Sequence, residues 1–133
     1  MDNETYLHFD ALQAIARRTD AVTADCACGA PELDEWTSLP VSFPEQQLRV
    51  IGTLVRDAYA EATYKEYHPQ GTTLWSAKAP IAALYFPYNR CTVSECEICQ
   101  RAYLRYVEGG GYFVDSRIRR LRTGVLVDAP LSE

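Results

Sequence analysis

The chain lacks the short motifs that mark the common classes of enzyme. It has no G-x-S-x-G nucleophile elbow, no G-x-x-x-x-G-K-[ST] phosphate loop, no H-E-x-x-H metal site and no G-x-G-x-x-G before a helix. The zinc deaminase pattern is also missing, because no H-x-E triplet occurs and Glu95 stands where that pattern has proline. Metal-dependent catalysis is therefore disfavoured.

A long apolar run and a secretory leader are missing as well. No stretch approaches the roughly 18 apolar residues that a membrane helix requires. The first residues, Met1 to Tyr6, are acidic and lack the basic and apolar regions of a signal peptide. We therefore expect a soluble protein of the reducing cytoplasm, without a membrane partner.

The composition that remains fits one small globular domain spanning residues 1–133. Apolar residues make up 47% of the chain, which is enough for a modest core. Seven glycines and seven prolines are scattered without a period, so collagen-like and low-complexity architectures are excluded.

Charge is unevenly distributed along the chain. The net charge of −5 argues against broad nucleic-acid binding, because phosphate contacts need a positive face. Acids dominate residues 1–48, whereas arginines dominate residues 90–123. The simpler interpretation is that the two regions face each other in the fold. The alternative is an exposed patch that docks onto an acidic protein or, less favoured by charge, a nucleic-acid strand, and its residues are Arg117, Arg119, Arg120 and Arg122.

The pattern of apolar residues predicts an α+β fold with an N-terminal helix and a small, mainly antiparallel, β-rich half. Phe9, Leu12 and Ile15 recur at helical spacing and indicate an amphipathic helix over 5–18. Residues 25–47 predict a long ordered loop that Trp36 and Phe43 hold in place. A strand over 47–55 and a helical turn within 56–71 are expected next. Further candidate strands cover 72–77, 81–88, 102–108, 112–118 and 124–129.

The segment from Arg101 to Ile118 has two interpretations. As a β-hairpin, Tyr103 and Val107 share one face, Leu104 lies on the other, and glycines 109–111 supply the turn. As a helix, Ser94-x-x-Glu97 is a capping box, residues 96–108 including 100–108 are helical, and Gly109 is the C-terminal stop. Its density of aromatic residues, and the second β-like segment that follows, favour the hairpin.

The five cysteines are the most specific feature of the sequence, and they are Cys26, Cys28, Cys91, Cys96 and Cys99. A structural zinc site needs four ligands at tetrahedral corners, which two short segments can supply as pairs. "CACG" contains a C-x-C pair, and "CEIC" contains a C-x-x-C pair. At these spacings both thiolates of a pair can point inward while backbone amides of the same turn donate to sulfur. The predicted ligands of Zn²⁺ are Cys26, Cys28, Cys96 and Cys99.

These two segments resemble the zinc-ribbon and zinc-knuckle class, whose C-x-x-C turns often lead into a β-hairpin. The resemblance covers 25–29 and 95–113, about a fifth of the chain, and Gln100 stands where many knuckles have glycine. It implies a structural zinc ion and no particular activity. Because residues 29–95 separate the two pairs, most of the domain must be an insertion between them.

Other interpretations of the thiols remain open at this point. A thioredoxin-like redox pair would place Cys96 and Cys99 at the start of a helix. A disulfide framework suits secreted chains with an even number of cysteines, and buried reduced cysteines can act simply as small hydrophobes. A rival metal site would join Cys91 to Cys96 and Cys99, with Cys28 or His68 as its fourth ligand.

The expected function is that of a small zinc-binding protein of the binding, adaptor or regulatory kind. Nine tyrosines in so short a chain suit an interface with another protein. Size and charge alone would also fit a bacterial immunity factor. The alternative class is a thiol-redox or metal-dependent enzyme that uses the Cys96-x-x-Cys99 pair.

Overall fold

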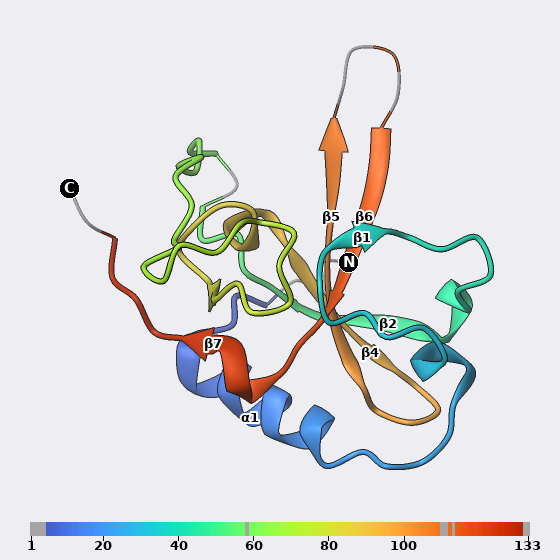
Figure 1. The fold of residues 1–133 in the computed structure, drawn as a ribbon. Coiled ribbons are helices and arrows are strands. Elements are labelled where there is room, and N and C mark those ends of the chain that lie inside the picture. The colour runs from blue at the N-terminus through green and yellow to red at the C-terminus, as the bar shows by residue number, and fades with distance from the viewer. Residues whose placement is uncertain (1–4, 58, 110–111, 113, 132–133) are drawn as a thin grey trace.

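The computed structural model describes residues 5–57, 59–109, 112 and 114–131, and it has the expected α+β architecture (Figure 1). One α-helix, α1 (Phe9–Asp20), packs against a five-stranded sheet with strand order β1-β6-β5-β4-β2. All neighbouring strands of this sheet are antiparallel. Its strands are β1 (Thr37–Ser38), β2 (Leu48–Thr53), β4 (Thr92–Cys96), β5 (Ala102–Gly109) and β6 (Val114–Arg120).

Several short elements lie around this sheet. A second, two-stranded sheet pairs β3 (Ile81–Ala82) with β7 (Leu126–Val127) in parallel. The described residues also contain four 3₁₀ turns: η1 (Ala27–Gly29), η2 (Glu45–Gln47), η3 (Tyr88–Arg90) and η4 (Thr123–Val125).

A hydrophobic core packs on each face of the five-stranded sheet. Successive residues of a strand point to opposite faces, and neighbours such as Tyr103 and Leu104 therefore enter different cores. Leu104 packs with Val93 and with Leu12 of α1, whereas Tyr103 packs with Cys96 on the opposite face. Trp36 and Phe43 are buried, one in each core, so they hold the long loop in place as predicted.

The predicted hairpin is confirmed. Strands β5 and β6 pair from Tyr103↔Arg120 to Gly109↔Val114, so the helical interpretation of this segment is wrong. Gly109 is the last residue of β5, and its φ angle is not positive. Glycines 110 and 111 lie outside the described residues.

The helix begins later than predicted because the residues before it join the sheet. Tyr6 forms a parallel bridge with Thr53, and the Leu7 amide donates to the Thr53 carbonyl at 3.0 Å. Close approach of these two segments depends on Gly52, since a Cβ at this position would lie 2.5 Å from Cδ1 of Leu7. Residue 52 also follows a register shift in the β2–β4 pairing.

Three further predictions are wrong. The expected strand over 81–88 is a strand only at Ile81–Ala82, and the residues after it form turns that lead into η3. The described residues of 56–71 contain no helical turn, because side chains bind backbone carbonyls of this segment: Asn89 donates to the Thr63 carbonyl and Arg90 to the Ala62 carbonyl. Residues 72–77 form turns closed by local hydrogen bonds instead of a strand. Strand β4 was not predicted, because its five residues lie among the cysteines and lack a strong alternation.

Candidate metal centre

Four cysteines from two distant segments meet on one face of the sheet. The sulfur atoms of Cys26, Cys28, Cys96 and Cys99 all lie within 4.8 Å of one another. The sulfur of Cys26 is 3.8 Å from that of Cys96, and the sulfur of Cys28 is 3.4 Å from that of Cys99. Each close pair therefore joins the "CACG" loop to the "CEIC" turn, and none of the four is in a disulfide.

The "CEIC" turn is held by hydrogen bonds to sulfur. Cys96 ends β4, and its sulfur accepts from the amides of Ile98 and Cys99. The Cys99 sulfur accepts from the Arg101 amide at 3.5 Å. Gln100 has a φ of 75°, the left-handed conformation that favours glycine. These bonds orient both sulfur atoms toward the cluster.

The "CACG" loop is the short 3₁₀ turn η1. The Gly29 amide donates to the Cys26 carbonyl at 2.9 Å, which closes the turn and places Cys26 and Cys28 on the same side of it. A Cβ at Gly29 would lie 3.0 Å from Nη1 of Arg101, so glycine here leaves room for the guanidinium group. That group donates to the Cys99 sulfur at 3.5 Å.

Two other polar side chains contact the sulfur atoms. The Gln47 amide oxygen lies 3.5 Å from the sulfurs of both Cys26 and Cys96. The Tyr103 hydroxyl donates to the Cys28 carbonyl at 3.0 Å and lies 3.3 Å from its sulfur. Sequence reasoning did not identify Gln47, Arg101 or Tyr103 as neighbours of the cluster, and no local motif marks them.

The thiols differ in their readiness to ionise. Burial raises the pKa of Cys28 well above its usual range and also raises that of Cys96. Partial burial acts in the same direction on Cys99, but hydrogen bonds from Arg101 and Cys28 outweigh it and lower its pKa to about 7. Thiolate is the form that binds metal, so the Arg101 contacts favour a metal-binding form of Cys99.

The members of the rival ligand set lie elsewhere. Cys91 is fully buried in the core beside α1, where its sulfur donates to the Pro87 carbonyl. The His68 ring nitrogens are 2.8 Å from the Thr72 hydroxyl and 2.7 Å from the Glu66 carboxylate. Among the described residues, neither belongs to the group that can hold an ion.

The arginine cluster is largely engaged inside the domain. Arg119 is 0% exposed and donates to the carbonyls of Asp34, Ala77 and Ala79 and to the Tyr88 hydroxyl. Both Arg120 and Arg122 pair with Asp34, as expected if the acidic N-terminal region faces this cluster. Arg117 pairs with Asp115 and Glu108 within the hairpin. Arg119 has no exposed surface to offer a partner, and partner binding by the other three stays a prediction.

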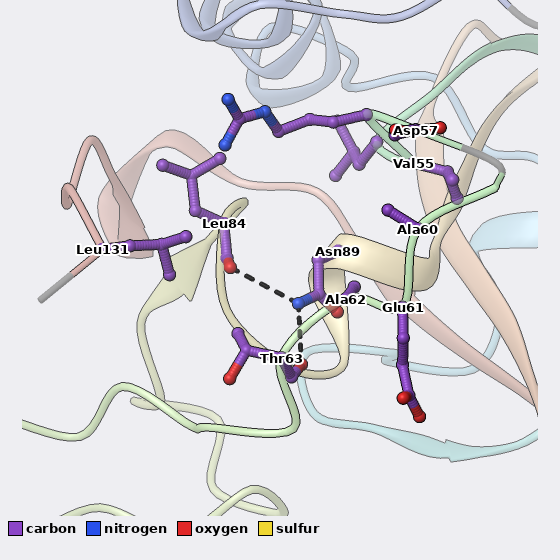
Figure 2. Close-up of a pocket in the computed structure, with 11 residues that line it drawn as sticks. Val55, Asp57, Ala60, Glu61, Ala62, Thr63, Leu84, Asn89 and Leu131 are labelled. Atoms are coloured by element: carbon purple, nitrogen blue, oxygen red, sulfur yellow. Dashed lines mark hydrogen bonds between the residues drawn. The ribbon is translucent and has the colours of Figure 1, made fainter. Parts of the chain in front are cut away.

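A hollow of about 370 Å³ lies between the 54–63 segment and η3, and none of the four clustered cysteines lines it (Figure 2). Figure 2 shows the Asn89 amide at its centre, donating to the carbonyls of Thr63 and Leu84. Its lining includes no histidine or cysteine, and one Asp57 carboxylate oxygen accepts from the Tyr59 amide. The charged residues of the lining are Arg56, Asp57 and Glu61.

No protein-family model matches this chain, and no curated protein or solved structure matches it significantly. Within the described part of the chain, no helix combines the length and apolar character needed to cross a bilayer.

Proposed function

We propose that this chain is a small zinc-binding protein in which Cys26, Cys28, Cys96 and Cys99 hold one structural Zn²⁺ ion. The observation that carries the proposal is the convergence of four sulfur atoms, all within 4.8 Å of one another. A tetrahedral site with zinc–sulfur bonds of about 2.3 Å has sulfur–sulfur edges of about 3.8 Å. The two close pairs, at 3.8 and 3.4 Å, are near that value.

The donor set favours zinc and a structural role. Four thiolates fill a tetrahedral shell and leave no position for water or substrate, whereas catalytic zinc sites keep one position open. The ion would tie the "CACG" loop to the sheet and close the long insertion between the two cysteine pairs. Its binding energy would then stabilise residues 1–133 as one domain, as the zinc-knuckle resemblance implies.

A non-enzymatic binding or adaptor role is the function that this arrangement supports best. The alternative, a thiol-redox enzyme, calls for a C-x-x-C pair at the start of a helix. Here Cys96 ends a strand, and Cys99 lies in the turn before the next strand. Free thiols at all five cysteines fit a protein of the reducing cytoplasm.

Metal analysis of the purified full-length protein tests the proposal. We expect one equivalent of zinc per chain by elemental mass spectrometry, and the same stoichiometry after refolding with zinc. Cobalt substitution reports the ligands, because tetrahedral thiolate coordination gives intense visible absorption bands. A zinc content near zero together with no cobalt–thiolate bands would overturn the proposal.

A further inference from the structure

Strand β5 extends beyond β4, one of its two neighbours in the sheet. Strand β4 begins at Thr92, which lies opposite Arg105, whereas β5 continues to Gly109 and stays paired with β6 over this length. Figure 1 shows β5 and β6 projecting past the other strands. From Tyr106 to Gly109, the β4 side of β5 therefore has no strand beside it among the described residues, although η3, the turn that leads into β4, contacts β5.

Backbone groups of Val107 face this open edge. The Cys96 amide donates to the Arg101 carbonyl, and the Leu121 amide donates to the Ala102 carbonyl. Successive residues of a strand direct their backbone groups to opposite neighbours, so odd-numbered residues of β5 face the β4 side. Val107 lies past the start of β4, and its side chain is 61% exposed. Its amide and carbonyl can therefore pair with an added strand.

A pocket of about 460 Å³ lies beside the open edge. Its lining includes three guanidinium groups, from Arg90, Arg105 and Arg117, one carboxylate, from Glu45, and two aliphatic side chains, from Leu39 and Val107. Guanidinium groups recognise carboxylates through paired hydrogen bonds, and apolar walls take a hydrophobic side chain. The lining thus suits a ligand that carries a carboxylate next to an apolar group.

Among the guanidinium groups of this pocket, Arg117 is paired with Glu108 and Asp115, whereas Arg90 has no carboxylate partner in the described part of the chain. Arg90 donates to neutral acceptors, including the Ala62 and Thr63 carbonyls, and its guanidinium group stacks over the rings of Tyr64 and Phe86. Arg105 contacts the Glu45 carboxylate at 3.2 Å, but the Glu45 side chain is 58% exposed. The Arg105 side chain is only 22% exposed, so the contact is half-buried, but the exposed Glu45 side chain can move away and leave its place to another carboxylate.

We propose that this edge binds the C-terminal end of an extended peptide from another protein. A strand added beside Val107 would lie on the same side of β5 as β4 does. It would have to end before Thr92, because β4 begins there. If it runs antiparallel to β5, as β4 does, it ends there with its carboxylate near Arg90 and Arg105. The last side chain of the peptide packs on Leu39. The proposal goes beyond the zinc site and does not depend on it.

A pool of synthetic hexapeptides tests the proposal, made once with free C-terminal carboxylates and once as amides. Each pool is passed over the immobilised full-length protein at low salt, and the retained peptides are identified by mass spectrometry. We expect the retained free-acid peptides to end in an apolar residue, and amidation to weaken the best of them at least tenfold. Equal retention of both pools, or of neither, would overturn the proposal.

The affinity of single-residue variants for the best retained peptide, measured by titration, tests whether the peptide binds at this pocket. Arg90→Gln and Arg105→Gln should each weaken binding about tenfold or more, since each removes a charge-assisted bond. Glu45→Gln should strengthen binding severalfold, because it removes the competing carboxylate. Arg49→Gln is the control, since this exposed arginine lies outside the pocket and should leave the affinity unchanged. Unchanged affinity in both Arg90→Gln and Arg105→Gln would place the peptide elsewhere and refute this site.

Discussion

The sulfur atoms of Cys28 and Cys99 lie 3.4 Å apart although the two residues are 71 positions apart in the chain. Chain connectivity does not explain such proximity, because the η1 turn and the β4–β5 turn belong to separate segments that meet on one face of the sheet. In the proposed zinc protein, one ion bound between the two turns would hold that contact together.

Replacing one ligand should therefore remove both the ion and much of the stability. We expect Cys96→Ser to lose the bound zinc and to lower the free energy of unfolding by more than about 3 kcal/mol, as linkage to a tightly bound ligand requires. The matched control is Cys91→Ser, since Cys91 is buried away from the cluster. It should lose stability but keep one zinc per chain by elemental analysis. A zinc-free Cys91→Ser protein or a zinc-replete Cys96→Ser protein would contradict the assigned ligands.

The reactivity of the thiols should depend on the metal. In the folded, zinc-loaded protein we expect no fast-reacting cysteine, because four sulfur atoms bind the ion and Cys91 is fully buried. A strong chelator should release four fast thiols, and denaturant should release the fifth. Titration with a chromogenic disulfide reagent measures each count. Five fast thiols in the untreated folded protein would be incompatible with a tight site of four thiolates.

Sequence patterns predicted the elements whose signals are local and repeated. The β5–β6 hairpin has alternating aromatic and apolar residues with glycines between its strands, and the cysteines form two short-spaced pairs, one C-x-C and one C-x-x-C. Strand β4 and the residues that contact the sulfur atoms were not predicted, because tertiary contacts and not local sequence patterns determine their positions. Gln47, for example, becomes a neighbour of Cys26 and Cys96 only when β2 pairs with β4.

Close packing between Leu7 and Gly52 leads to a prediction about the stability of the protein. A methyl group at position 52 would lie 2.5 Å from both Cδ1 and Cγ of Leu7, so Gly52→Ala must displace the segment before α1. We expect it to cost about 1–3 kcal/mol, the usual range for overpacking in a core. Gly124→Ala is the control, since a Cβ there has nothing within 4 Å. Denaturant unfolding of both variants measures the difference, and equal stabilities would show that the N-terminal segment is not held in this way.

Arg119 should be essential for stability, because it is a buried cation that serves several acceptors at once. Its guanidinium group donates to three backbone carbonyls and to the Tyr88 hydroxyl, so Arg119→Met would leave all four acceptors without this donor. Hydrogen bonds from charged groups contribute about 1.5–3 kcal/mol each, and we expect a loss of at least about 3 kcal/mol in urea unfolding. Arg49→Met, at an exposed position, should stay within about 0.5 kcal/mol of the parent protein. If the two variants have the same free energy of unfolding, the hydrogen bonds of Arg119 do not stabilise the packing of β6 against the loops around it.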